Sequence, residues 1–225
     1  MNSFILKIIA LICMCFDHVG NSILGKFSFL NLIGRFSFPI FAFQSVQGYI
    51  HTKNFKKHMI KLLIFACISQ IPFQLFLSTY SNSFYLNIFF TFLLGLFSLH
   101  LYDHINNKFI GLICVTFIAI IGELIKVDYG AFGIILMFIF YVFKDKKKYL
   151  IPSTLLLFLL HHIPNMIEYP SYILTYTSLF IFSSLSLVFI CFYNKKEGPK
   201  AKYLFYIFYP LHLLILYILS TFFIH

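Results

Sequence analysis

Ionisable side chains that stand inside long apolar stretches are the residues of this sequence best able to do chemistry. Asp17 and His18 lie next to each other within the first stretch, and Arg35 stands near the start of the second. An ionised group at membrane depth costs about 2.5–3.5 kcal/mol on insertion scales, so it usually serves a function or pairs with another group. A histidine with an ordinary pKa suits general-base catalysis at neutral pH. We therefore expect proton-transfer chemistry centred on His18.

The spacing within the first stretch limits what each group can do. Adjacent helical residues point about 100° apart, so Asp17 cannot cleanly orient the ring of His18. Asp17 instead shares a helix face with Asn21. Two plainer interpretations stay open: a buried acid that only fixes helix packing, and an arginine that only extends to the membrane surface. We expect Asp17 to pair with Arg35 or to cap a neighbouring helix, and His18 to find its orienting partner elsewhere.

A polar stripe runs along the second apolar stretch. Its members are Gln44, Gln47, Gly48 and His51, at relative positions i, i+3, i+4 and i+7, and Lys53 follows in the next loop. Such a face cannot meet lipid, so it must line protein or a water-filled cavity. We expect Gln44, Gln47, His51 and Lys53 to bind a substrate that enters from the basic side of the membrane.

Other polar residues lie in later stretches. Gln70 and Asn87 occupy the third and fourth, Asp128 follows the fifth, and Tyr209 and His212 stand within the last. Close helix packing is an equally simple explanation for a small or polar stripe of this kind. We expect His212, with Arg35, as a candidate to stabilise an oxyanion, and the other four as substrate-binding residues.

The apolar stretches that hold these residues dominate the composition. Hydrophobic residues make up 60% of the 225 residues and charged residues 11%, against about 45–50% and about 25% in an ordinary soluble domain. This excludes a water-soluble globular protein, a disordered chain and a disulfide framework. At roughly 20 residues per span the length accommodates about nine membrane helices. We expect residues 1–225 to form a single all-α polytopic membrane domain.

The expected spans are long apolar runs separated by polar breaks, and the sixth and seventh are short. Runs of this length do not alternate as membrane β-strands do. The spans are Phe4–Leu24, Leu32–Ile50, Met59–Leu77, Leu86–Tyr102, Phe109–Ile125, Tyr129–Phe143, Leu150–Ile163, Tyr172–Tyr193 and Tyr203–Ile224.

The net charge is +10, and most of the basic residues that produce it fall in alternate breaks between the expected spans. With nine spans and a cytoplasmic N-terminus, 14 of the 17 basic residues fall on the cytoplasmic side, and the C-terminus lies outside. Only Lys26, Arg35 and Lys126 fall on the outer side. We interpret the lysines as topology anchors, so we expect no nucleic-acid partner. They are Lys7, Lys53, Lys56, Lys57, Lys61, Lys108, Lys144, Lys146, Lys147, Lys148, Lys195, Lys196, Lys200 and Lys202.

The cysteines and the first apolar segment give no sign of a metal or of secretion. All five cysteines lie inside expected spans without metal-ligand spacing, so we interpret them as packing residues and expect no metal. The first segment contains Asp17-His18 and lacks a small-residue cleavage site, so we interpret it as a span. The abundance of Phe, Ile, Asn and Lys is consistent with an AT-rich bacterial genome, and we expect the bacterial cytoplasmic (inner) membrane.

A series of short motifs extends over nearly the whole chain. They are Leu6–Ala10, Asp17–Gly20, Ile33–Arg35, Phe38–Phe43, Gly48, His51-Thr52, Ser69–Phe73, Asn87–Thr91, Asp128–Gly130 and Phe208–Leu213. In their order and spacing they resemble the TraX family of bacterial membrane proteins. The resemblance implies N-terminal acetylation of a pilin with acetyl-CoA as the donor. Family members often carry an acid where this chain has Gln70, so that position is not required here as a base.

A looser likeness links the chain to integral-membrane acyltransferases that modify surface polysaccharides. In those enzymes an early-span histidine and arginines line the catalytic tunnel. The comparable pieces here are Asp17-His18, Arg35–Tyr49 and Tyr209–His212. The likeness favours transmembrane acyl transfer.

These observations together predict an acyl-CoA-dependent acetyltransferase with His18 as general base. Acetyl-CoA is the expected donor substrate, held by the basic loops, and the acceptor is a pilin-like protein, a polysaccharide or a lipid. Two other hypotheses use the same residues without covalent chemistry. One is a transporter or channel for a small solute, and the other is a scaffold for surface-polymer assembly.

Overall fold

The computed structural model describes residues 1–24, 28–199 and 202–223, which are helical apart from turns, loops and an isolated bridge between Leu86 and Val127. Lys26 and Lys200, which the charge pattern assigns to opposite sides, lie outside the described residues. The helices are α1 (Ser3–Val19), continued by a π-helical turn (Gly20–Leu24), α2 (Phe29–Gly34), α3 (Ser37–Ile50), α4 (Phe55–Leu77), α5 (Ile88–His104), α6 (Lys108–Leu124), α7 (Gly130–Val142), α8 (Lys147–Glu168), a 3₁₀ turn (Pro170–Tyr172), α9 (Ile173–Cys191) and α10 (Lys202–Phe223).

The chain is an all-α membrane protein. Five helical segments among the described residues are long and apolar enough to cross a membrane, and α5 and α7 are shorter apolar helices. Large apolar side chains cover the outside of the bundle: Leu124 is 74% exposed, Leu174 80% and Phe222 78%. Exposed apolar surface of this extent marks a face that meets lipid or another protein. The five segments are Ser3–Leu24, Phe55–Leu77, Lys147–Glu168, Pro170–Cys191 and Leu204–Phe222.

The helix that corresponds to the seventh expected span, Leu150–Ile163, is longer than that span. The helix α8 has 22 residues and contains both Pro152 and Pro164. Pro152 is the sixth residue of α8, and it has no N–H to donate to the backbone oxygen of Lys148. Neighbouring helices can re-satisfy the backbone groups that Pro164 frees. The prediction of a short span was therefore wrong, because α8 continues beyond Ile163 as far as Glu168.

The second expected span, Leu32–Ile50, is interrupted. α2 ends at Gly34 and α3 begins at Ser37, so the break falls at Arg35 and Phe36. Pro39 then occupies the first turn of α3, where the backbone N–H groups have no intrahelical partner in any case. The sequence predicts one continuous span over Leu32–Ile50, whereas the structure has two helices with Arg35 at their junction.

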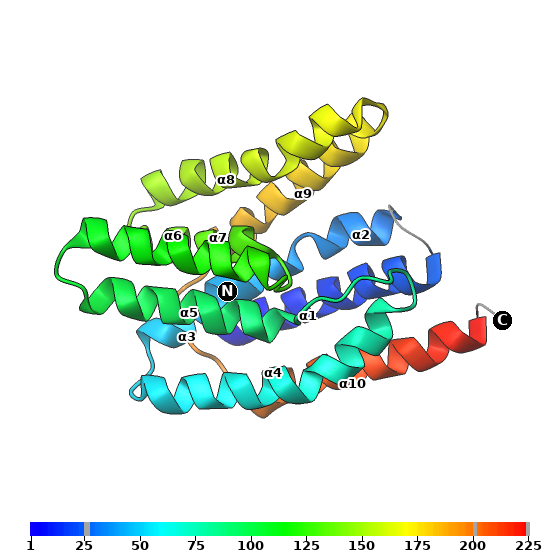
Figure 1. The fold of residues 1–225 in the computed structure, drawn as a ribbon, viewed down its shortest axis with the longest axis horizontal. Helices are drawn as coiled ribbons and strands as arrows, with labels where there is room; N and C mark the ends of the chain where they lie inside the picture. Colours follow the sequence, from blue (N-terminus) through cyan, green and yellow to red (C-terminus); the bar gives the residue numbers. More distant parts are fainter. Residues whose placement is uncertain (25–27, 200–201, 224–225) are drawn as a thin grey trace.

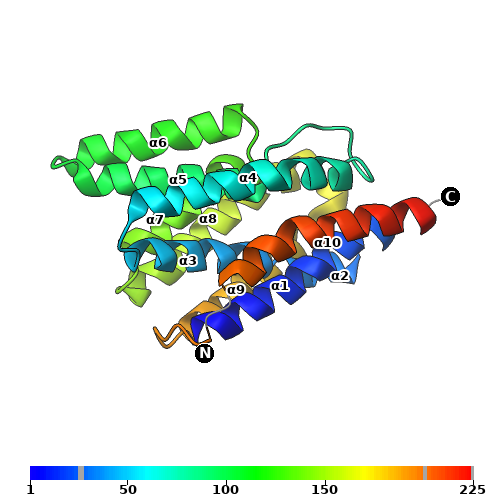
Figure 2. The same cartoon turned by 90° about the horizontal axis from the view of Figure 1, so that it is seen from below.

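Helices far apart in the sequence pack around a central α3. α3 contacts α1, α5, α7 and α9, and α10 packs along α4 and α1 (Figures 1 and 2). The first and last helices, α1 and α10, are therefore neighbours, and α8 and α9 form an outlying hairpin. The buried core follows α3, with Phe38, Ile40 and Phe43 packed among apolar side chains of the surrounding helices. This arrangement brings the polar face of α3 toward α1, where the hydroxyl of Ser3 donates to Oε1 of Gln44.

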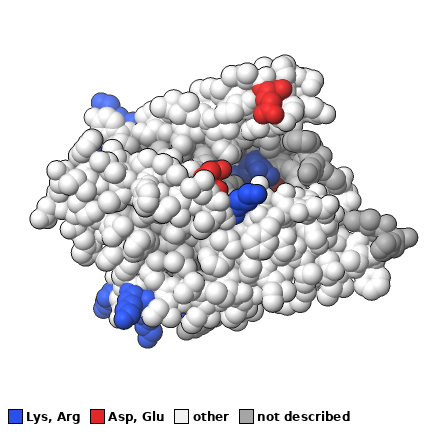
Figure 3. Space-filling model, viewed as in Figure 1, with Lys and Arg blue, Asp and Glu red and all other residues white. Residues whose placement is uncertain are grey.

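Charged side chains gather in several places on the face seen in Figure 3, including an acidic patch at the upper right. Basic side chains occupy the end of the bundle where α4 and α8 begin. A second group, with both acidic and basic side chains, lies in a hollow near the middle of this face. The lysine-bearing starts of α4, α6 and α8 lie at the same end of the bundle (Figure 1), which agrees with the expected clustering of basic loops on one side.

Candidate active site

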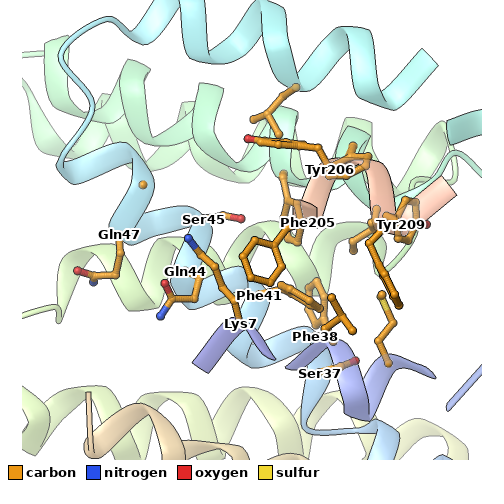
Figure 4. A pocket seen from close by; sticks show the side chains of 18 of the residues that line it. Lys7, Ser37, Phe38, Phe41, Gln44, Ser45, Gln47, Phe205, Tyr206 and Tyr209 are labelled. Atoms are coloured by element: carbon orange, nitrogen blue, oxygen red, sulfur yellow. The ribbon is translucent and has the colours of Figure 1, made fainter. Parts of the chain in front are cut away.

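A continuous cavity of about 870 Å³ lies inside the bundle. At the lysine-rich end its wall includes Lys7, His51, Lys53 and Lys195, and toward the other end it includes Asp17, His18, Arg35 and Asp128. Aromatic rings line the middle, among them Phe38 and Phe41 of α3 and Phe205 of α10 (Figure 4). The cavity therefore joins the polar stripe of α3 to the ionisable residues of α1 and of the α2–α3 junction.

The predicted stripe faces this cavity. Gln44, Gln47, His51 and Lys53 all line it, and so does Tyr209 of α10. Gln44 is 5% exposed and Tyr209 6% exposed, so both lie deep in the wall. The expectation that the stripe faces a cavity instead of lipid is confirmed.

Asp17 and Arg35 form an ion pair. Nη2 of Arg35 donates to Oδ1 of Asp17 at 2.6 Å, and Nδ2 of Asn21 donates to the other carboxylate oxygen at 3.2 Å. The break between α2 and α3 permits this, since Arg35 stands at a helix end and can turn inward. Gly34 lets the helices approach, because a Cβ at that position would lie 2.3 Å from Cβ of Asp17. The expected pairing of Asp17 with Arg35 is confirmed.

Asn31 belongs to the same cluster, and sequence reasoning missed it. Its Nδ2 donates to the backbone oxygen of Asp17 at 3.0 Å and to Oδ1 of Asn21 at 3.0 Å, while its own Oδ1 accepts from the backbone N–H of Ser28 at 3.0 Å. Asn31 is 3% exposed. The spacing of four residues between Asn31 and Arg35 is the sequence pattern that could have identified Asn31, because it puts the two residues on one side of α2 and its C-cap.

His18 and His212 form a hydrogen-bonded chain. Nδ1 of His18 lies 2.8 Å from Nε2 of His212, and Nδ1 of His212 lies 2.9 Å from the backbone oxygen of Phe208. The two rings are inclined by only 5°. A carbonyl oxygen only accepts, so Nδ1 of His212 carries a hydrogen, and in the neutral ring Nε2 of His212 then accepts. Nδ1 of His18 is therefore the donor, which leaves Nε2 of His18 unprotonated in a ring that lines the cavity.

Asp128 and Tyr129 form part of the wall from the turn between α6 and α7. Tyr129 has a left-handed backbone (φ 63°), and its ring stacks on Phe38 with centroids 3.6 Å apart. The hydroxyl of Thr91 donates to the backbone oxygen of Asp128 and ties the turn to α5. Loss of hydration raises the pKa of the Asp128 carboxyl to about 7, with the charge of Asp17 adding to the rise and that of Arg35 opposing it.

Gln70 and Asn87 lie outside the lining of the cavity and bind each other. Oε1 of Gln70 accepts from the backbone N–H of Asn87 at 3.0 Å and from its Nδ2 at 2.9 Å. Oδ1 of Asn87 in turn accepts from the backbone N–H of Phe89 and caps α5. The pair fixes the end of the loop between α4 and α5, whose Tyr80 and Tyr85 do line the cavity.

The lining also includes residues that the sequence analysis did not single out. Tyr80, Tyr85 and Tyr129 were missed because each lies in or beside a loop, where no periodicity marks its direction. Lys7 was interpreted only as a topology anchor, although it belongs to a set of α1 residues that recur at helical spacing on one face. One face of α1 carries Ser3, Lys7, Leu11, Met14 and His18 at helical spacing, and all five line the cavity.

No group of three or more metal-ligating side chains was found within the part of the chain that the structure describes. The cysteines there are unpaired, and Cys13 is buried in the bundle.

Comparisons with known proteins agree over nearly the full length. The family model described as TraX protein matches residues 3–220. The chain is also similar to the probable fimbrial assembly protein FimC, serogroup H1, of Dichelobacter nodosus, with 27% identity over 235 residues, 96% of this chain and 94% of that protein. No solved structure matches this chain.

Proposed function

This chain belongs to the TraX family, and we propose that it is a membrane-embedded acyltransferase that moves an acetyl group from acyl-CoA to an amine or hydroxyl of a membrane or cell-surface acceptor. The family is associated with pilin acetylation, and the relative named above carries the name of a fimbrial assembly protein. A role in pilin modification or assembly is the broader statement, and acetyl transfer is the specific one. The single cavity that reaches from the lysine-rich mouth to His18 is the observation that supports it.

The donor enters from the cytoplasm in this proposal. The chain crosses the inner membrane of a bacterium nine times, with the N-terminus inside and the C-terminus outside, so that the lysine-rich end faces the cytoplasm. Lys7, Lys53 and Lys195 at the mouth attract the phosphates of CoA. The thioester arm then extends between the aromatic rings of the cavity toward His18.

His18 acts as the general base. Its Nε2 takes the proton from a neutral amine or a hydroxyl as that nucleophile attacks the thioester carbonyl carbon. The tetrahedral intermediate then collapses, the carbon–sulfur bond breaks, and the CoA sulfur leaves with the proton that His18 returns. His212 holds the ring of His18 in the required tautomer through the 2.8 Å contact, in the way that a third group orients a catalytic histidine.

Arg35 is the better of the two candidates to stabilise the oxyanion. Both ring nitrogens of His212 are already engaged, one with Phe208 and the other with His18. Arg35 lines the cavity together with His18 and carries five N–H donors, of which Asp17 and Asn31 take two in the bonds described. The remaining donors can meet charge that develops on the thioester oxygen.

The acceptor reaches the site from the other end. Asp128, Tyr80 and Tyr85 line the cavity there. In this proposal the hollow with mixed charge in Figure 3 is the entrance for the acceptor. A buried site reached from two ends keeps water away from the thioester until the acceptor arrives.

A transporter for a small solute is the second candidate, because charged residues line the cavity at both of its ends. Purified protein in liposomes separates the two. Acetyl transfer or hydrolysis is measured with radiolabelled acetyl-CoA, and flux is measured with radiolabelled acetate. Turnover that His18→Ala abolishes and His161→Ala preserves supports the acyltransferase. Acetate flux without turnover, or turnover that His18→Ala leaves unchanged, contradicts it.

A further inference from the structure

Lys7 stands inside the cavity, unlike the other lysines of the mouth. Its side chain lines the cavity and is partly buried, and its ammonium lies 5.7 Å from the centroid of the Phe205 ring. Figure 4 shows this side chain extending from α1 into the space between α3 and α10. Lys53 and Lys195, by contrast, are exposed. Because the face of an aromatic ring attracts a cation, the contact with Phe205 keeps the charge of Lys7 within the cavity.

Lys7 and His18 belong to one row of α1 that faces the cavity, with Leu11 and Met14 between them. Lys7 precedes His18 by eleven residues, and at 1.5 Å per residue this puts the two roughly 16 Å apart along the helix axis. Both Cα–Cβ bonds tilt toward the start of α1, so the two side chains are displaced in the same direction. The flexible stem of lysine takes up the remaining difference. The row therefore sets the distance between a cation and the proposed base.

The same distance separates the two ends of a phosphopantetheine arm. Roughly thirteen bonds join the thioester sulfur of acetyl-CoA to the nearest phosphorus atom, and an extended chain advances about 1.2 Å per bond, which gives about 16 Å. A thioester placed beside His18 therefore brings this phosphate to the level of Lys7. The rest of the arm then lies along Leu11 and Met14.

The linker between α9 and α10, which carries Lys195, lies farther from the proposed base than Lys7 does. The backbone N–H of Ser3 donates to the oxygen of Lys196 at 2.8 Å, so this linker meets α1 one turn, or roughly 6 Å, beyond Lys7. Lys195 is also engaged with Asp145, at 3.0 Å. An exposed lysine of this kind can attract the anionic donor from a distance. It does not fix where the thioester stops.

We propose that Lys7 binds the phosphate at the pantetheine end of the donor and thereby sets the depth at which the thioester stands beside His18. This inference rests on the proposed acyl-CoA donor and deepens it. The contact is made to the phosphate that the pantetheine arm itself carries. The recognised donor class is therefore a thioester of 4′-phosphopantetheine, to which the nucleotide of CoA adds little. Lys7 is a specificity-determining residue.

Three donors separate the phosphate from the nucleotide: acetyl-CoA, S-acetyl-4′-phosphopantetheine and S-acetylpantetheine, which has no phosphate. The unchanged protein should use the first two with similar kcat/KM. In Lys7→Met, kcat/KM should fall roughly ten- to hundredfold for these two, the effect of one lost hydrogen bond between charged groups. It should stay unchanged for S-acetylpantetheine. Lys7→Arg keeps the cation and should retain most of the activity, and Lys7→Gln repeats the test if Lys7→Met does not fold.

Lys148→Met is the matched control. The ammonium of Lys148 also lies against an aromatic ring, 5.9 Å from the centroid of Tyr149, but Lys148 stands outside the lining of the cavity. Its variant should use all three donors as the unchanged protein does. Lys7→Met/Leu11→Lys separates position from charge, because it returns the cation to the cavity one turn closer to His18. If position matters, this variant should not recover the use of acetyl-CoA.

Equal losses for all three donors in Lys7→Met, no loss, or full recovery in Lys7→Met/Leu11→Lys would overturn the inference while leaving acyl transfer intact. A strong preference of the unchanged protein for acetyl-CoA over S-acetyl-4′-phosphopantetheine would also overturn it. If the unchanged protein turns over no donor, the proposed function fails, and calorimetric titration with 4′-phosphopantetheine decides the inference. Binding that Lys7→Met weakens and Lys148→Met preserves supports it, and equal or absent binding overturns it.

Discussion

His18 and His212 are separated by almost the whole chain, yet Nδ1 of the first lies 2.8 Å from Nε2 of the second. The contact exists because α10 packs along α1, so the first and last helices of the chain lie side by side. The backbone oxygen of Phe208 ends the chain of hydrogen bonds and fixes its direction. His18 thereby acquires the orienting partner that its neighbour Asp17 cannot provide.

This relationship predicts a graded response at position 212. His212→Phe removes the acceptor for Nδ1 of His18, so the imidazole can adopt either tautomer, and kcat should fall roughly 100-fold with KM for acetyl-CoA unchanged. His212→Gln retains an acceptor oxygen and should recover part of the loss. Steady-state kinetics with labelled acetyl-CoA measures both. A role in packing alone would instead give equal losses for the two variants.

The ion pair between Asp17 and Arg35 should respond as a unit. Asp17→Asn or Arg35→Gln alone leaves a partly buried charge without its partner, and breaking a buried pair typically costs about 3–5 kcal/mol. Each variant should unfold at a lower temperature than the unchanged protein. The double variant Asp17→Asn/Arg35→Gln should recover much of the loss. Circular dichroism melts in detergent report all three, and strictly additive losses would argue against a coupled pair.

Gly34 should not tolerate a methyl group. A Cβ at Gly34 would lie 2.3 Å from Cβ of Asp17, so Gly34→Ala must push α2 away from α1. The expected result is a lower melting temperature and weaker acetyl transfer. Gly48 offers the control, since nothing lies within 4 Å of a Cβ placed there. Gly48→Ala should be neutral or stabilising by about 0.5–1 kcal/mol, and equal melting temperatures for the two variants would count against this packing.

Asp128 should make stability depend on pH. Its pKa is raised in the folded protein to about 7 from the ordinary value of 3.8. The unfolded chain therefore loses this proton first as pH rises, and stability falls between about pH 4 and pH 7. Asp128→Asn stays neutral throughout, so its melting temperature should match that of the unchanged protein at pH 4 and exceed it at pH 8. Parallel curves for the two proteins would contradict the raised pKa.

The helices and the polar stripe of α3 could be predicted because each depends on local periodicity. Long apolar runs specify helices, and the spacing of Gln44, Gln47 and His51 specifies one face. The break at Arg35 could not be predicted in the same way, since it depends on Asn31 and Gly34 packing against Asp17. The partner of His18 was also beyond sequence reasoning, because nothing local indicates that α10 packs beside α1.

The position of Gln70 and Asn87 outside the cavity lining could not be predicted from the sequence either. Both are polar residues at the ends of apolar stretches, which is also where substrate-binding groups stand. Their mutual hydrogen bonds satisfy them and leave the tyrosines of the adjoining loop to line the cavity. Residue type alone does not tell a structural amide from a binding one.

The central claim is that one cavity brings the acyl group of a cytoplasmic donor to His18. It is tested most directly by photocrosslinking with an acyl-CoA that carries a diazirine in its acyl group, followed by mass spectrometry. Crosslinks in α1 near Met14 and His18 and in α10 near Phe208, all suppressed by excess acetyl-CoA, are the predicted result. Crosslinks confined to the exposed lysines of the mouth, or crosslinks that acetyl-CoA does not suppress, would contradict the claim.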